Sequence, residues 1–270
     1  MLIDSHCHLD YPGLAERLPE VLARAAEAGV GRMLTISTRV RDAATYRALA
    51  ERHPEVLFTI GTHPHNAGEE PDVPAAEIAE LARHPRCIAI GEAGLDFHYD
   101  YAPRDVQERV FRRHIEAARL SGLPLVIHAR EADEVMIRVL REEHGRGAFD
   151  AVLHCFSSTE ALARAGVELG FYLSFSGILT FKGSTEIRRI AAEIAPRERL
   201  LVETDAPYLA PAPHRGRTNE PAYVAHTAKV LAETIGLGID ETARLTSANF
   251  LRLFAKARPF VEPVADSAAA

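Results

Sequence analysis

The sequence has few cysteines and lacks several features that would assign it to a protein class. Cys7, Cys87 and Cys155 are the only three among 270 residues, and no two of them form a CxxC motif. So sparse a set argues against a disulfide framework and fits the reducing cytoplasm, where we expect the protein to act. No stretch is apolar enough to cross a bilayer, and the chain runs straight into Asp4 and histidines. We therefore expect neither a membrane segment nor a signal peptide.

The chain also lacks a positive charge balance. Its 31 Lys and Arg residues are outnumbered by 38 Asp and Glu residues, which gives a formal net charge of -7. This balance provides no general attraction to a nucleic-acid backbone. A phosphate-bearing substrate is still compatible with it, because bound divalent cations would reverse the sign of the field inside a site.

Short apolar, β-branched segments alternate along the chain with longer segments of helical composition. No glycine-rich nucleotide fingerprint follows the first apolar segment, which disfavours the main alternative, an open doubly wound sheet. Eight alternations predict an α/β protein with a single-domain (β/α)8 TIM barrel. The expected strands are residues 2–6, 33–37, 56–60, 86–90, 125–128, 151–154, 171–174 and 200–203.

Some helix boundaries can be predicted from the spacing of apolar residues and from capping residues. Residues 103–121 and 240–257 carry apolar side chains at helical spacing. Asp240 is expected to be the N-cap of the second of these helices. Ser157 and Glu160 have the spacing of a capping box.

The end of the chain differs in composition from the rest. From about Pro259 onward it is rich in proline and alanine. We therefore expect a catalytic domain over residues 1–258 and a flexible tail over residues 259–270.

A His-x-His element, His6-Cys7-His8, stands at the end of the first expected strand. The two-residue repeat of a strand puts His6 and His8 on one face and Cys7 on the other. Two adjacent imidazoles can bind a divalent metal, but such a pair is as often an ordinary hydrogen-bonded surface pair. Cys7 and Cys155 are expected to be small buried side chains rather than nucleophiles.

Ionisable side chains recur at the ends of other apolar strands, where each would be costly without a partner. In a barrel all of these strand ends meet at one rim, so a shared metal site explains them better than separate structural roles. Imidazoles and carboxylates without a required thiolate suit Zn²⁺, Mn²⁺ or Mg²⁺. The candidate ligands beyond His6 and His8 are Glu92, His128, His154, Glu203 and Asp205.

The number of candidate ligands is sufficient for two ions. Glu92 is the natural carboxylate to bridge them, and a metal-activated water would then be the nucleophile. Asp205 could accept the proton of that water, or it could be a ligand only; the sequence leaves both roles open. We therefore take Glu92 and Asp205 as the candidate catalytic residues.

Basic and imidazole side chains on the same expected loops suit an anionic substrate. His63 and His65 form a second His-x-His element. They could be metal ligands, but the expected site is already well supplied, so we favour contact of at least one of them with substrate phosphate over a merely structural loop. Arg130, Lys182 and Arg215 also follow strands, although any one of them could be a solvated surface charge.

The ensemble of motifs resembles the TatD family of metal-dependent deoxyribonucleases, within the amidohydrolase superfamily. The matching elements span the chain in order. They are residues 4–10, 61–65, 91–96, 107–118, 128–130, 154–157, 203–208, 215–221 and 249–254.

The resemblance implies a (β/α)8 fold and a centre of two, possibly three, divalent ions. By motif position it implies one ion held by His6, His8, Glu92 and Asp205, and a second held by Glu92, His128 and His154. It implies help from Glu203 with a further ion, and phosphate contacts from His65 and Lys182.

The activity implied by the resemblance is hydrolysis of DNA phosphodiester bonds, often as a 3′-to-5′ exonuclease, with links to DNA repair. Single strands or ends of DNA would be the partner, and no obligate protein partner is implied. One alternative keeps the metals but replaces DNA with a small phosphoester, amide or lactone. The other is a non-enzymatic, metal-stabilised binding protein with a closed coordination shell.

Overall fold

The computed structural model describes residues 1–261, and it contains one sheet of eight strands. The strands follow one another in chain order, and each is parallel to the next. A parallel bridge between Cys7 and Ala206 joins the first strand to the segment after the last one. The predicted (β/α)8 barrel is therefore confirmed. Its strands are β1 (Leu2–Cys7), β2 (Val30–Thr35), β3 (Val56–Ile60), β4 (Cys87–Asp96), β5 (Leu125–Arg130), β6 (Ala151–Leu153), β7 (Tyr172–Phe175) and β8 (Leu200–Val202).

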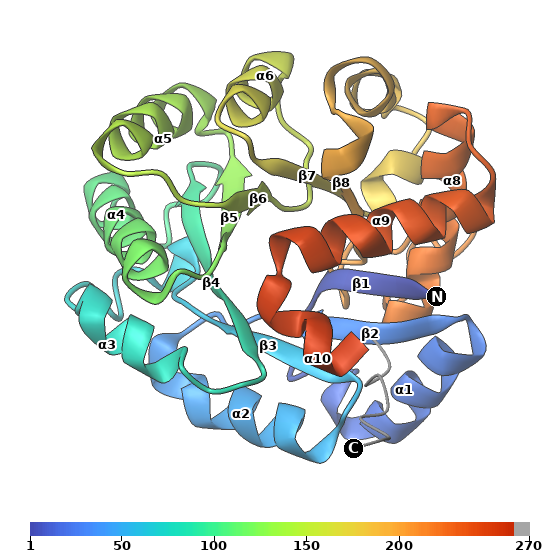
Figure 1. Ribbon diagram of the computed structural model, residues 1–270, viewed down its shortest axis with the longest axis horizontal. Coiled ribbons are helices and arrows are strands. Elements are labelled where there is room, and N and C mark those ends of the chain that lie inside the picture. Colours follow the sequence, from blue (N-terminus) through green and yellow to red (C-terminus); the bar gives the residue numbers. More distant parts are fainter. Residues whose placement is uncertain (262–270) are drawn as a thin grey trace, which may run out of the picture.

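Helices surround the strands as an outer ring, which Figure 1 shows from one end of the barrel. Short 3-10 segments and one π-helical segment join many of these elements. The α-helices are α1 (Leu18–Glu27), α2 (Ala43–Arg52), α3 (Ala75–Leu81), α4 (Arg104–Ser121), α5 (Asp133–Arg146), α6 (Glu160–Glu168), α7 (Thr185–Arg189), α8 (Val224–Ile235), α9 (Ile239–Leu253) and α10 (Arg258–Val261).

The strands are buried on both sides, and their side chains alternate between two cores. On β3, Val56 and Phe58 belong to the core between sheet and helices, whereas Leu57 belongs to the core inside the barrel. Successive side chains of a strand point to opposite faces, and here both faces are apolar because every residue of the segment near Leu57 is buried. At this depth Leu57, Ile88 and their neighbours fill the inside of the barrel.

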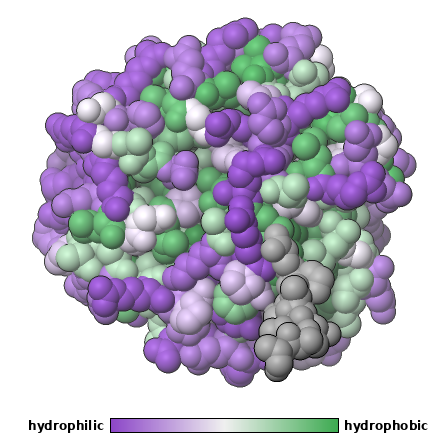
Figure 2. Space-filling view, viewed as in Figure 1, coloured by the Kyte–Doolittle hydropathy of each residue, from purple (hydrophilic) through white to green (hydrophobic). Residues whose placement is uncertain are grey.

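The C-terminal helices close one end of the barrel. Phe250 and Phe254 are buried against the inner core, and α9 and α10 lie across that end in Figure 1. Asn249 donates to the carbonyl of Leu200 at the start of β8, so this is the end where the strands begin. Figure 2 shows this face, with hydrophilic side chains around its outline. A site for ligands is therefore left to the opposite end, where the strands finish.

Two predicted helix caps were wrong. The N-cap of α9 is Gly238, and Asp240 lies in the first turn, where its charge favours the helix dipole without capping it. The cap of α6 is Thr159, whose hydroxyl accepts from the amide of Leu162, rather than Ser157. A hydroxyl at Thr159 is next to the first helical residue and therefore reaches the free amides, which Ser157 does not.

The end of the chain is helical for longer than we expected. Residues 258–261 form α10, so the first part of the expected tail belongs to the folded chain. Residues 262–270, the rest of that tail, lie outside the described residues. Within the described part, no helix combines the length and the apolar character needed to cross a membrane.

Strand β4 is twice as long as the sequence suggested and extends through Glu92 to Asp96. Two glycines allow its close approach to the end of β3. A side chain on Gly61 would place its Cβ atom 2.4 Å from the Cα atom of Gly91, and Gly91 itself has a φ of +114°. Glycine is the residue that tolerates both conditions. This approach brings the Glu92 side chain to the rim where the other strands end.

The buried His114 of α4 ties the loop after β3 to the helix ring. Its Nε2 atom accepts from the amide of Thr62 at 2.9 Å, and its Nδ1 atom lies 2.9 Å from the carbonyl of Val110. Burial lowers the pKa of His114 to about 4. The His114 ring is therefore neutral in the folded chain at neutral pH. As the pH falls, His114 binds a proton in the unfolded chain at a higher pH than it does in the folded chain.

We expect His114→Gln to reduce the loss of stability in acid. Between the unfolded pKa of about 6.5 and the folded pKa, the unfolded state binds more protons, so lowering the pH destabilises the fold. From pH 7 to pH 5 this one group costs about 2 kcal/mol of unfolding free energy. Urea denaturation at both pH values should show the wild type losing about that much more than the variant. Equal losses in both proteins would contradict the assignment.

Candidate metal centre

Glu92 lies at the centre of the rim where the strands end, and its two carboxylate oxygens face different groups. Glu92 Oε2 lies 3.4 Å from His6 Nε2 and 4.0 Å from His8 Nε2. Asp205 Oδ1 completes this first group, at 3.6 Å from His6 Nε2 and 3.5 Å from His8 Nε2. His6 of β1 and His8 directly after it therefore both point to the site, as the strand repeat predicted. Cys7 points to the other face, where its thiol donates to the carbonyl of Leu34.

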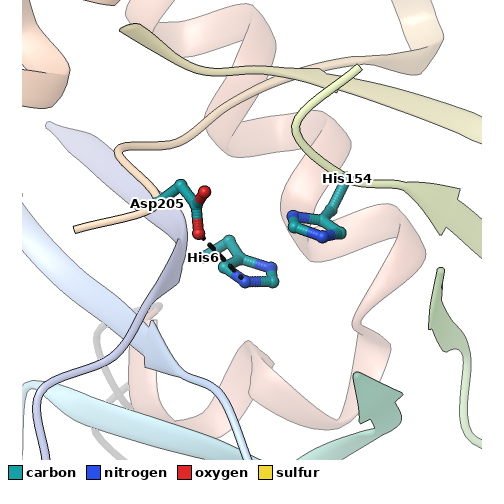
Figure 3. A group of neighbouring side chains, drawn as sticks. All are labelled: His6, His154 and Asp205. Carbon is teal, nitrogen blue, oxygen red and sulfur yellow. Dashed lines mark ion pairs between the residues drawn. The ribbon is translucent and has the colours of Figure 1, made fainter. Parts of the chain in front are cut away.

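The other oxygen of Glu92 faces a second group, made of three imidazoles. Glu92 Oε1 lies 2.7 Å from His154 Nε2 and 2.8 Å from His128 Nδ1. His63 Nε2 lies 3.6 Å from the same oxygen. The sequence favoured a phosphate contact for at least one of His63 and His65 and allowed both as metal ligands; His63 lies among the candidate ligands. The two groups share Glu92 and meet where the His6 and His154 rings stack, with centroids 3.8 Å apart. Figure 3 shows these two rings beside Asp205.

The donor set fits divalent metal ions. His6 Nε2 and Glu92 Oε2 are buried, and neither has a hydrogen-bond partner among the described residues. Polar atoms left in this way are costly unless something binds them. The first group is spaced at 3.4–4.0 Å. Ligands around one tetrahedral zinc ion lie roughly 3.4 Å apart. In the second group, His154 Nε2 and His128 Nδ1 lie within hydrogen-bond distance of Glu92 Oε1. An ion bound there would replace the imidazole protons that make these contacts.

The electrostatics of the site come from one buried carboxylate among several imidazoles. Burial alone would raise the pKa of Glu92, but His154, His63 and His6 together hold it well below its usual range. Burial alone would lower the pKa of His154, but Glu92 and Glu203 outweigh it and raise that pKa well above its usual value. The site therefore favours a cation beside Glu92, either as protons on imidazole or as a metal.

Backbone contacts between β1 and the chain after β8 fix the first group. The amide of Asp205 donates to the carbonyl of His6 at 2.9 Å, and the amide of His8 donates to the carbonyl of Ala206 at 2.8 Å. Buried Asp4 accepts from the amide and hydroxyl of Thr204. Burial raises the pKa of Asp4 to about 8, although those hydrogen bonds oppose the shift. The closure of the barrel thus sets the distance between His6, His8 and Asp205.

Glu203 and Cys155 lie behind His154. Glu203 Oε1 is 3.3 Å from His154 Nδ1 and accepts from the amide of Cys155 at 2.7 Å. This contact orients the His154 ring so that Nε2 faces Glu92. The Cys155 thiol lies 3.2 Å from the hydroxyl of Ser176, and burial raises its pKa well above the usual range, as expected for a thiol that does not act as a nucleophile.

Asp96 also belongs to the candidate site, although the expected strand ends did not include it. Asp96 Oδ2 lies 3.1 Å from His128 Nε2 and 2.8 Å from His65 Nε2. Burial would raise the pKa of Asp96, but hydrogen bonds from His128 and His65 outweigh it and hold that pKa far below its usual range. The missed signal was the true end of β4: Asp96 is its last residue, whereas the sequence placed the end at Ile90.

A cleft of about 580 Å³ opens over the two groups. Among the residues proposed to contact substrate, His63, His65 and Arg130 line it. Lys182 and Arg215 do not line it. Both are exposed, and the Arg215 guanidinium lies over the ring of Phe181 at 3.5 Å. Contact of Lys182 and Arg215 with substrate stays a prediction. It would require a substrate long enough to extend beyond the cleft.

We expect Glu92→Gln to reduce the number of ions bound, because an amide cannot bridge two cations with two anionic oxygens. Equilibrium dialysis against Mn²⁺ followed by metal analysis should give about two ions per wild-type chain and fewer in the variant. Glu116→Gln, on the exposed face of α4, removes the same charge far from the site and should bind as the wild type does. Equal binding by all three proteins would contradict the bridging position.

We expect Asp96→Asn to weaken metal binding without abolishing it. The amide can no longer hold both His128 and His65 by an anionic oxygen, and loss of such an orienting partner typically costs about 10- to 100-fold in metal affinity. Calorimetric titration with Mn²⁺ measures the change. An affinity equal to that of the wild type would show that Asp96 does not orient these rings.

Comparison with known proteins assigns the chain to a family. Residues 3–255 match the family model described as TatD related DNase. The chain is 40% identical over 256 residues to an uncharacterized metal-dependent hydrolase, YcfH, of Escherichia coli, covering 94% of this chain and 95% of that protein. It is 33% identical over 258 residues to a protein of Salmonella typhimurium named 3′-5′ ssDNA/RNA exonuclease TatD, covering 94% of this chain and 98% of that protein.

A solved structure agrees with this assignment. The crystal structure of YjjV, a TatD homologue of Escherichia coli, superposes with a TM-score of 0.87 at 29% identity and covers 94% of this chain and 98% of that chain. Sequence and fold are therefore matched over nearly the whole length of the relatives. The chain belongs to the TatD family of metal-dependent hydrolases.

Proposed function

We propose that the chain hydrolyses phosphodiester bonds of DNA, as an exonuclease working in the 3′-to-5′ direction. The observation that carries the proposal is the position of Glu92 between two groups of imidazoles and Asp205, beneath a cleft lined by further cationic and imidazole side chains. The direction of cleavage rests on the similarity to the relative named a 3′-5′ exonuclease. Action in the cytoplasm and a role in DNA repair stay predictions.

In this proposal the two groups of side chains hold two divalent ions. His6, His8 and Asp205 would hold one, His128 and His154 the other, and Glu92 both; His63 is close enough to join the second group. Mg²⁺, Mn²⁺ and Zn²⁺ all suit this ligand set. When bound, such ions supply an activated water and neutralise charge on the phosphate. Glu203 would orient His154 rather than hold an ion of its own, because it faces the far nitrogen of that ring.

Asp205 is the best placed of the carboxylates to accept a proton. Its side chain is 15% exposed, whereas those of Glu92 and Glu203 are 2% and 0% exposed. A proton acceptor must reach the water that attacks phosphorus. Glu92, Asp96 and Asp205 all line the cleft, and Asp205 is the most exposed of the three. The His8 hydrogen bond keeps the pKa of Asp205 below its usual value against the effect of burial, so the group is ionised at neutral pH.

The mouth of the cleft would hold the phosphate backbone. His65 faces Asp96 with Nε2 and remains 27% exposed, so it would donate to a phosphate oxygen through Nδ1 when that nitrogen also carries a proton. Arg130 lines the same cleft and carries a permanent positive charge. Contacts of this kind recognise the backbone rather than the bases, so cleavage should depend little on sequence.

We expect the metal-loaded wild type to shorten 5′-labelled oligonucleotides one nucleotide at a time from the 3′ end. Asp205→Asn should lower kcat by at least about a hundredfold, the scale of general base catalysis, while Glu116→Gln should leave it unchanged. Denaturing gels with Mg²⁺, Mn²⁺ and Zn²⁺ measure both effects. Intact oligonucleotides together with cleavage of a small phosphoester, amide or lactone would favour the alternative substrate class. No turnover of any substrate would support the metal-stabilised binding protein.

A further inference from the structure

The exposed aromatic side chains of the chain are gathered at one place. Among the described residues, Tyr99, Tyr101 and Tyr208 are the large aromatic side chains that are exposed, at 39%, 66% and 52%. All three line the cleft over the metal centre, and half-buried Tyr11 lines it with them. Exposed apolar rings that collect at a site, rather than scatter singly over a surface, indicate a binding role.

Two of these rings pack against each other in the cleft as a tilted pair. Tyr99 and Tyr101 have centroids 5.2 Å apart and are tilted by 33°. The guanidinium of Arg130 lies 5.0 Å from the Tyr99 centroid. Tyr101 is thus the more exposed ring of a tilted pair, and Tyr99 and Arg130 support it. His65 packs edge-on against both tyrosine rings. His65 and His128 also contact the same carboxylate, that of Asp96. The pair of tyrosines therefore lies beside the second group of ligands.

The other two rings stand beside the first group of ligands. The ring of Tyr11 stacks on His8, with centroids 4.8 Å apart and planes 26° apart. Tyr208 lies edge-on to Tyr11, with centroids 6.1 Å apart. The Tyr208 backbone is fixed on both sides, because its amide donates to the carbonyl of Asp205 and its carbonyl accepts from Asn219. Tyr208 is thus a supported ring with an exposed surface.

We propose that Tyr101, supported by Tyr99, and Tyr208, supported by Tyr11, are two base-stacking surfaces, one on each side of the scissile phosphate. The inference rests on the proposed nuclease function and adds how that site selects its substrate. The phosphate would lie at Glu92, between the two groups of ligands, so the nucleotides before and after it would reach opposite aromatic surfaces. Stacking accepts every base, which agrees with recognition of the backbone by His65 and Arg130.

The arrangement requires unpaired bases. A base within a duplex is already stacked and paired, so it cannot offer its face to a tyrosine without being unstacked first. The two surfaces therefore select single strands or frayed ends with at least one free base on each side of the cleaved bond. A net charge of -7 fits this mode, since the chain would engage a short segment rather than follow a long duplex.

The test uses oligonucleotides that carry one abasic residue on either side of the cleaved bond. We expect each abasic residue to raise the KM of the metal-loaded wild type about tenfold, within the range that base–aromatic stacking supplies. Tyr101→Ala should abolish the penalty on one side only, and Tyr208→Ala the penalty on the other. Tyr101→Phe and Tyr208→Phe keep the rings and should keep both penalties. Leu120→Ala, which removes an exposed apolar side chain on the outer surface, should behave as the wild type.

Two further results separate the stacking surfaces from the rest of the site. Mn²⁺ binding by both alanine variants should equal that of the wild type, because neither tyrosine is among the candidate ligands. The chain has no tryptophan, so its seven tyrosines dominate the intrinsic fluorescence. An intact oligonucleotide should quench the tyrosine fluorescence of the Asp205→Asn variant more strongly than the abasic oligonucleotide does. Cleavage with no abasic penalty would overturn the stacking surfaces alone. Failure to cleave any oligonucleotide would overturn the nuclease function and the stacking surfaces together.

Discussion

The site depends on one buried carboxylate whose two oxygens face different partners. Glu92 is 1% exposed, yet imidazoles surround it on both sides and hold its pKa well below the usual range. A charge in that position is tolerated only while cationic groups or ions stay beside it. The rings of His6 and His154 stack beside Glu92. Glu203 accepts from His154, and Asp96 contacts His128, so both of these carboxylates favour a cationic environment there.

The barrel makes this concentration of polar groups possible by separating the two ends of its strands. At the end where strands begin, Phe250 and Phe254 seal an apolar interior. At the opposite end the same strands carry histidines and carboxylates, which therefore meet without competing with the hydrophobic core. The closure between β1 and the segment after β8 is part of the site as well as of the fold, because it brings Asp205 beside His6 and His8.

The cleft combines two kinds of recognition that suit one type of ligand. In the proposed function, His65 and Arg130 would offer charge and hydrogen bonds to a phosphate backbone, and the tyrosines of the same cleft would offer flat apolar surfaces. The aromatic rings are attached to the metal centre through His8 on one side and through His65 and Asp96 on the other. Binding of ions by the candidate ligands would therefore also fix the positions of the tyrosine surfaces that would hold the substrate.

The sequence by itself determined the barrel and most of the candidate ligands, because both depend on short-range patterns. Alternating apolar segments specify strands, and an ionisable residue at the end of such a segment, such as His128 or His154, must lie on one rim of a barrel. The true length of β4 could not be read in this way, since it depends on the contact between Gly61 and Gly91, two segments 30 residues apart along the chain. Asp96 was missed for that reason.

Only the tertiary structure decided which residues share a partner. The place of His63 beside Glu92, of Glu203 behind His154, and of Lys182 and Arg215 outside the cleft follows from how loops pack against distant strands. The tyrosines show the same limit, because Tyr11, Tyr99 and Tyr208 come from three separate loops. A pattern in the sequence fixes which way a side chain points from its own strand, but distances between strands are set by the packing of the whole barrel.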